Sequence, residues 1–252
     1  MATKKVTKKT NDLSTIEIPK WLQVGKDDLG TDGIESGDIQ MPRIKLCNPA
    51  SMIDKAGIGV SDGELFDVVT GKVFGKSLIM FPLLTWKSKV WFSDSFALLC
   101  TQYLNKETGQ TTEFGSDTSV INDKDKEGRS TGKDSYNFMV ITEEELQKAI
   151  AENSMPFPTA FSTVGTANKP TKQLNGKLKM NAMRSIPIYG QAVEITTKLV
   201  PNKKGTDFYI PQYAYPRFAN EKEFAMLKVL HEKAKTLQSR AVSSTGEDSS
   251  VL

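Results

Sequence analysis

The residues with the clearest chemistry in this chain are cations and aromatic rings between Lys169 and Tyr215. A segment without acidic residues comes first and carries Lys169, Lys172, Lys177, Lys179 and Arg184. A tyrosine-rich hairpin follows, with Lys203 and Lys204 in its turn and Tyr209, Tyr213 and Tyr215 at alternating positions of its second strand. Cations attract phosphates and flat rings stack on bases, so this pattern favours binding of a single-stranded nucleic acid.

A second group of the same kind lies in the sequence TWKSKVWFS. Alternate side chains of a strand point to the same side, which places Lys87, Lys89 and Trp91 on one face. Trp86, Val90 and Phe92 then lie on the other face, toward the core. Tyr103, in a later predicted strand, is a further candidate for stacking on a base.

Each of these features also has a purely structural interpretation. Lysines beside a tryptophan protect an edge strand against aggregation. The basic segment can be the solvated face of a helix, and the tyrosine stripe can pack beneath a helix, in particular the C-terminal one. The sequence leaves both interpretations open for all three features.

Composition and motifs exclude several function classes. The net charge of +3 is small, so an affinity for nucleic acid must come from local clusters of cations. The chain has no glycine-rich phosphate-binding loop, no His-Glu-x-x-His and no Gly-x-Ser-x-Gly, which argues against an enzyme. Two cysteines and one histidine do not form a zinc motif, so we expect no metal or cofactor. No apolar run is long enough to span a membrane, and the N-terminus lacks a signal peptide.

The elements that must hold these residues are mostly strands. Residues 1–40 predict a disordered basic arm and linker, and strands begin near Met41. Turn residues predict hairpins at Thr70-Gly71 and at residues 105–109. The apolar run after Ser77 predicts a central strand, with a bulge or a local edge at Pro82. Residues 115–135 mix charges with glycine and serine and predict a long mobile loop.

Three helices are expected among these strands. Thr142 and Glu145 form a capping box before a short helix. The segment 171–183 is expected to form a second helix, although Gly176 weakens it. Residues 220–240 have an apolar stripe and predict a long C-terminal amphipathic helix, followed by a disordered tail over 241–252. That stripe can pack on its own domain or form a homodimer.

These elements predict a mainly β fold with peripheral helices. Consecutive hairpins over residues 41–219 favour an antiparallel β-barrel of the oligonucleotide-binding (OB) type, elaborated by loops. A generic β-sandwich is the alternative.

Four segments together resemble a known family. They are MPRIKLCNP, WKSKVWFS, KQLNGKLKM and NKKGTDFYIPQY, spread over residues 41–240. In this combination the chain resembles OB-fold single-stranded-DNA-binding proteins encoded by phages. The resemblance implies a role in phage replication or recombination, in the cytoplasm of the infected host. Two features depart from the family: the central loop has no cysteines, and the tail has only Glu247 and Asp248 as acids and ends in Val251-Leu252.

The sequence therefore predicts a non-enzymatic, sequence-tolerant single-stranded-DNA-binding protein. Phosphates would be captured by Lys87, Lys89, Lys172, Lys177, Lys179, Arg184, Lys203 and Lys204, and bases would stack on Trp91, Tyr103, Tyr209 and Tyr213. Its expected partners are single-stranded DNA and phage replication or recombination proteins. The alternatives are a phage structural or virion-associated β-sandwich protein and a single-strand annealing recombination protein.

Overall fold

The computed structural model describes residues 41–49, 51, 55–92, 98–104, 110–114, 118–121, 132–202, 205 and 207–247. The predicted arm and linker over 1–40 lie outside the described residues, as do Lys203, Lys204 and residues 248–252. Most of the predicted loop 115–135 also lies outside them. Within that range, Ser119–Ile121 forms a 3₁₀ turn and Lys133 begins a strand.

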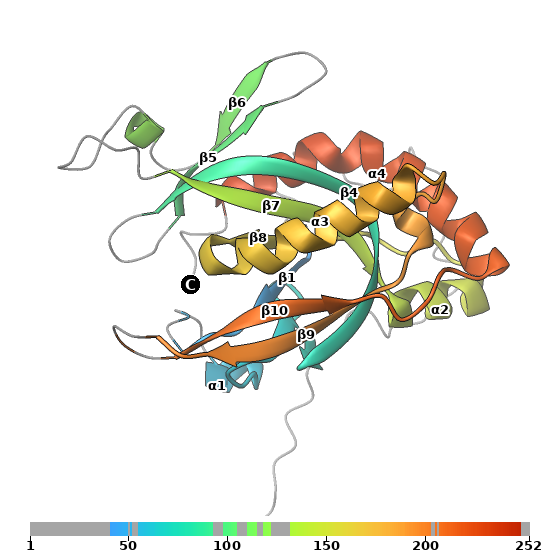
Figure 1. Cartoon of the computed structure of the whole chain (residues 1–252), viewed down its shortest axis with the longest axis horizontal. Helices are drawn as coiled ribbons and strands as arrows, with labels where there is room; N and C mark the ends of the chain where they lie inside the picture. Colours follow the sequence, from blue (N-terminus) through green and yellow to red (C-terminus); the bar gives the residue numbers. More distant parts are fainter. Residues whose placement is uncertain are drawn as a thin grey trace, which may run out of the picture. The chain divides into compact units, whose positions relative to one another are not determined.

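The described residues form one ten-stranded sheet with the order β10-β9-β4-β7-β8-β1-β2-β3. β5 branches from β4 and pairs in turn with β6 (Figure 1). The strands are β1 (Arg43–Leu46), β2 (Leu65–Asp67), β3 (Val73–Gly75), β4 (Ser77–Phe92), β5 (Leu98–Leu104), β6 (Thr111–Phe114), β7 (Lys133–Thr142), β8 (Thr159–Val164), β9 (Val193–Val200) and β10 (Phe208–Ala214). The mainly β class is confirmed.

The long strand β4 organises this sheet, as its apolar sequence predicts. One edge of β4 pairs with β7, while the other edge pairs first with β9, at Ser77–Met80, and then with β5, at Ser88–Phe92. The register with β7 shifts between Pro82 and Leu84, which confirms the predicted bulge. A proline has no N–H to donate to a neighbouring strand, so a break in the ladder is expected there.

The predicted antiparallel OB-type barrel needs correction. β1 pairs with β8 in parallel, with Arg43 opposite Ala160, so the sheet is mixed. Among the described strands no pairing joins β10 to β3, so the sheet is not closed into a barrel. Turn residues reveal hairpins between strands that follow each other in sequence. The pairing of β1 with β8 has no such local signal, and the prediction missed it for that reason.

Helices cover both faces of the sheet. The described helices are α1 (Lys55–Ile58), α2 (Glu143–Glu152), α3 (Asn168–Ala182) and α4 (Glu221–Glu247). The predicted capping box of α2 is confirmed, because the Thr142 hydroxyl accepts a hydrogen bond from the backbone N–H of Glu145 at 3.2 Å. α4 begins after Asn220 as predicted but extends to Glu247 instead of ending at 240.

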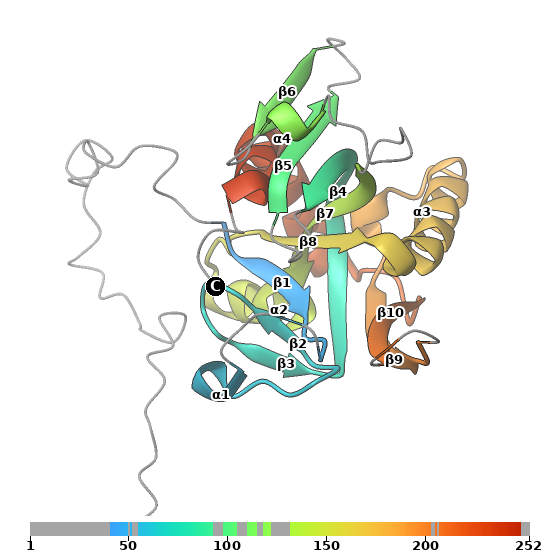
Figure 2. The same cartoon turned by 90° about the vertical axis from the view of Figure 1, so that its left-hand side faces the viewer.

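Each face of the sheet has its own core, because neighbouring side chains of a strand point in opposite directions. On β7, Phe138 and Val140 face α3, whose Leu174 and Leu178 join the same cluster. Met139 and Ile141 face α4, whose apolar stripe supplies Leu227, Leu230 and Ala234. α3 and α4 therefore lie on opposite sides of the sheet (Figure 2). Leu227, Leu230 and Ala234 of the α4 stripe are buried on the chain's own sheet, whereas Phe224 of the same stripe is 38% exposed.

Candidate nucleic-acid interface

The candidate interface is built on α3, a helix whose two sides differ sharply. Thr171, Leu174 and Leu178 are buried and hold its inner side on the sheet. Positions three and four residues apart share a helix face, so these three anchors leave the opposite side in solvent. Gly176 lies on that outer side, where packing does not depend on its missing side chain. The predicted helix is confirmed and is longer than expected, since it begins at Asn168.

The outer side of α3 is a row of cations. Its members are Lys169, Lys172, Lys177 and Lys179 on the helix and Arg184 just beyond it, and all five side chains are exposed. None of the five forms an ion pair within the described part of the chain. The nearest acidic residues in the sequence are Glu152 and Glu194. At about 1.5 Å per residue, the helix spans roughly 22 Å, enough to follow several phosphates of a strand.

The second predicted cation group lies beside the start of α3. Lys87 and Lys89 point away from the buried Trp86 and Val90, as strand alternation predicts. The Lys87 ammonium lies 2.8 Å from the Asp134 carboxylate, and this hydrogen bond raises the pKa of Lys87. The backbone carbonyl of the same Asp134 accepts a hydrogen bond from the Asn168 side chain at 2.8 Å. Asp134 thus joins the lysine-bearing part of β4 to the first turn of α3.

Trp91 does not take part in this surface. Its side chain is only 2% exposed, and its ring lies against Gly132, where an added Cβ would come within 2.6 Å of it. A ring covered in this way cannot stack on a base, so the structure corrects the predicted role of Trp91. The physical reason is the close approach of the backbone at Gly132, which strand alternation within β4 does not reveal.

Two tyrosines of the β9–β10 hairpin support α3 from below. The Tyr213 hydroxyl lies 3.0 Å from the Thr171 hydroxyl, and the Tyr215 hydroxyl donates to the Leu174 carbonyl at 3.1 Å. Burial raises the pKa of both hydroxyls, that of Tyr215 to about 12. The predicted stacking role of Tyr213 is therefore corrected: the stripe packs beneath a helix. The helix is α3 and not the C-terminal one.

The remaining predicted aromatic residues lie elsewhere. Tyr209 is half-buried, with its ring against Gly63 and the Lys76 ammonium 5.7 Å from the ring centroid. Tyr103 packs against the core on the α4 side of the sheet. It therefore does not share a face with the α3 cations.

One ring that the sequence did not single out does lie near the cations. Tyr136 of β7 is partly exposed, and Lys87 lies 5.8 Å from its ring centroid. Lys177 lies 4.4 Å from the centroid of Tyr215 in the same manner. The alternation of side chains in KDSYNFMVIT, considered together with the alternation in β4, is the sequence pattern that could have identified Tyr136.

Metal sites and membrane-spanning helices are both absent from the described residues. These residues contain no group of three or more histidine, cysteine, aspartate or glutamate side chains placed to hold a metal ion. They also contain no helix that is long and apolar enough to cross a membrane.

Comparison with known proteins gives one assignment. The family model described as Pam3 phage gp34-like protein matches residues 8–240. The chain belongs to this family. The match supports a phage origin, which the sequence resemblance also implied. No curated protein and no solved structure matches the chain significantly. In this gp34-like chain, the exposed cations of α3 together with Lys87 and Lys89 make up the candidate interface.

Proposed function

We propose that the chain binds single-stranded DNA during phage replication or recombination, through the outer side of α3. The observation that carries this proposal is the row of five exposed cations on and just after α3, none of which has an ion-pair partner among the described residues. Cations that are not neutralised within the protein are available to replace the counterions of phosphates. The small net charge of +3 makes this local concentration the relevant quantity.

Exposed apolar side chains among the cations favour a single strand over a duplex. Met180 on α3 is 60% exposed and Met183, directly after the helix, is 82% exposed, and both lie between Lys179 and Arg184 in the sequence. In a duplex the base faces are stacked inside the helix, whereas a single strand presents them to such side chains. Thioether side chains are flexible and polarisable, so they adapt to any base, which supports sequence-tolerant binding.

The proposal differs from the sequence prediction in how much base stacking and charge each contribute to the affinity. Trp91 and Tyr213 are committed to the protein's own packing, so less of the affinity can come from base stacking. Charge then carries the larger share, and binding should weaken steeply as salt is raised. Binding of this kind needs no catalytic group. It would take place in the cytoplasm of the infected host.

The test is fluorescence anisotropy with labelled oligo-dT at about 50 mM and about 200 mM salt. The variant Lys172→Gln/Lys179→Gln removes two cations from α3, while Lys222→Gln/Lys228→Gln removes two exposed cations from α4 on the other side of the sheet. Both variants change the net charge equally. We expect the α3 variant to lose affinity and the α4 variant to bind like the wild type. Absence of binding at low salt, a preference for duplex, or equal losses in both variants would contradict the proposal.

A further inference from the structure

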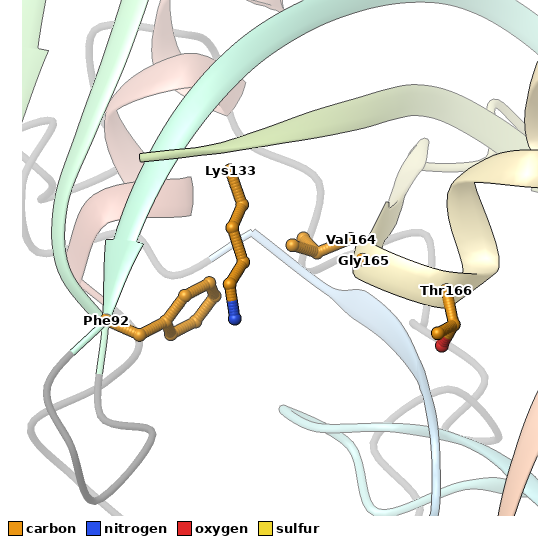
Figure 3. Close-up of a pocket in the computed structure, with 5 residues that line it drawn as sticks. All are labelled: Phe92, Lys133, Val164, Gly165 and Thr166. Carbon is orange, nitrogen blue, oxygen red and sulfur yellow. The ribbon is translucent and has the colours of Figure 1, made fainter. Parts of the chain in front are cut away.

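A shallow hollow lies beside the turn that leads into α3. Its volume is about 360 Å³, and it is lined by Phe92, Lys133, Val164, Gly165 and Thr166. Phe92 is the last residue of β4 and Lys133 the first of β7, while Val164 ends β8 and Gly165–Ala167 is the 3₁₀ turn that leads into α3. Figure 3 shows Phe92 and Lys133 together on one side and Val164, Gly165 and Thr166 on the other.

The side chains on the first side combine a flat ring with a positive charge. The Lys133 ammonium lies 5.7 Å from the centroid of the Phe92 ring. Lys133 is exposed and has no ion pair among the described residues. Asp134 is its neighbour in sequence, but strand alternation turns that carboxylate to the other face, where it pairs with Lys87. The ammonium is therefore available to a phosphate.

On the second side of the hollow, the space at Gly165 is not filled by other side chains. Gly165 has a φ of +66°, and a Cβ at this position would have no atom within 4 Å. The absence of a side chain keeps this side of the hollow open, and the positive φ favours glycine. Val164 offers an apolar surface and Thr166 an exposed hydroxyl, which can donate to a phosphate oxygen.

We infer that this hollow takes one unpaired base of a single strand that runs along α3. The base would lie between Phe92 and Val164, and an adjoining phosphate would contact Lys133 and Thr166. Lys169 follows Thr166 closely in the chain, so a strand that leaves the α3 cations at the start of the helix would pass over the Gly165–Ala167 turn to reach the hollow. The inference rests on the proposed function and adds to it a base-binding position outside the predicted tyrosine stripe.

The size and openness of the hollow favour one nucleotide of a strand as the occupant. Pockets that enclose small molecules usually measure roughly 300–1,000 Å³ and bury most of the ligand. This hollow is at the lower end of that range and opens to solvent. A free nucleotide would gain little here, whereas a nucleotide tethered to a strand on α3 is already held close to the site.

The experiment compares oligo-dT with an abasic strand of equal length, which has the same phosphates but no bases. In Phe92→Leu, we expect the affinity for oligo-dT to fall about tenfold, as for the loss of one stacked base, and the affinity for the abasic strand to stay unchanged. Phe157→Leu is the matched control, because Phe157 is 51% exposed and precedes the opposite end of β8. Lys133→Gln should weaken binding of both strands and lower the salt slope by about 0.7.

Three outcomes separate this inference from the proposed function. If Phe92→Leu binds oligo-dT as tightly as the wild type while the α3 double variant binds weakly, the hollow is not a base site and the α3 surface stands. If the wild type binds neither strand, both proposals fail. Thr166→Glu tests the hollow without altering packing, because Thr166 is exposed. Its carboxylate should weaken oligo-dT binding even if Phe92→Leu proves unstable, and unchanged binding in this variant overturns the inference.

Discussion

The hydroxyl oxygens of Tyr213 and Thr171 lie 3.0 Å apart beneath α3. The Thr171 hydroxyl donates its proton to the Ala167 carbonyl at 2.8 Å. A hydroxyl has only one proton, so Tyr213 must be the donor and Thr171 the acceptor in the bond between them. The Thr163 hydroxyl donates to the same Thr171 oxygen at 3.0 Å. The tyrosine ring is thereby fixed between the sheet and the helix.

Tyr213→Phe should therefore change stability and leave binding unchanged. The variant loses one hydrogen bond, and we expect the free energy of unfolding to fall by about 1 kcal/mol. Urea unfolding measures this fall, and oligo-dT titration measures binding. Tyr209→Phe is the control, because the Tyr209 hydroxyl forms no hydrogen bond in the described structure. A Tyr213→Phe variant with wild-type stability and reduced affinity would show that the ring faces the ligand.

Salt dependence should distinguish cations that are already paired from those that are not. Lys172→Gln should lower the slope of log affinity against log salt by about 0.7, the value for one phosphate contact of a single strand. Lys87→Gln should lower it by less, because Asp134 already neutralises the Lys87 ammonium at 2.8 Å. Titrations over a series of salt concentrations measure both slopes. A larger change for Lys87 than for Lys172 would place the strand on β4 instead of α3.

The carboxyl groups of the buried Asp67 and the half-buried Glu145 should make stability depend on pH. Burial raises the pKa of Asp67 and of Glu145, although backbone hydrogen bonds to Asp67 and the Thr142 hydroxyl bond to Glu145 act in the opposite direction. Both groups then bind a proton more tightly in the folded chain than in the unfolded one. Their contribution to stability is present below the unfolded pKa values of about 4 and is lost as pH rises through the raised folded values.

Asp67→Asn isolates one of these groups. The Asp67 Oδ1 atom accepts from the backbone N–H groups of Val69 and Thr70 at 2.8 and 2.9 Å, and an asparagine oxygen can accept the same bonds. We expect the variant to lose less stability than the wild type between about pH 4 and about pH 7. Urea midpoints of both proteins across this range provide the measurement. Parallel curves would show that Asp67 has the same pKa in the folded and unfolded chains.

His231 should be a structural residue. Its Nδ1 atom lies 2.8 Å from the Leu83 carbonyl oxygen, at the bulge where the pairing of β4 with β7 passes over Leu83. His231→Phe keeps a ring against Tyr189 but removes the donor, so the free energy of unfolding should fall by about 1–2 kcal/mol. Thermal unfolding measures the loss, with Glu232→Gln as an exposed control. Unaltered stability in His231→Phe would refute this role.

Local features of the fold were predictable because their signals lie within a few residues. Thr142 and Glu145 predict the start of α2. Thr70-Gly71 predicts the turn between β2 and β3, where Gly71 has a φ of +70°. The bulge at Pro82 follows from the missing N–H of proline. Each of these features depends on backbone chemistry that one short segment determines.

The candidate site was predictable only in its charges. Lysines on an acid-free segment remain exposed in almost any packing, so Lys172, Lys177 and Lys179 are found in solvent as expected. The fate of an aromatic ring depends on which distant segment packs against it. Trp91 is covered at Gly132, and Tyr213 is covered by α3, and neither contact leaves a pattern in the sequence around the ring.

One edge of β4 pairs with both β9 and β5, and this arrangement has a consequence for how the chain folds. Among the described strands, the edge of β4 at Ser77–Met80 pairs with β9, with Ser77 opposite Thr196, and β1 finds its parallel partner in β8. Pairings that close such long loops form late and slowly, typically on a scale of milliseconds to seconds. During synthesis, the edge of β4 at Ser77–Met80 stays unpaired until β9 has emerged from the ribosome. A chain interrupted before Val193 would therefore expose an apolar strand edge that is prone to aggregation.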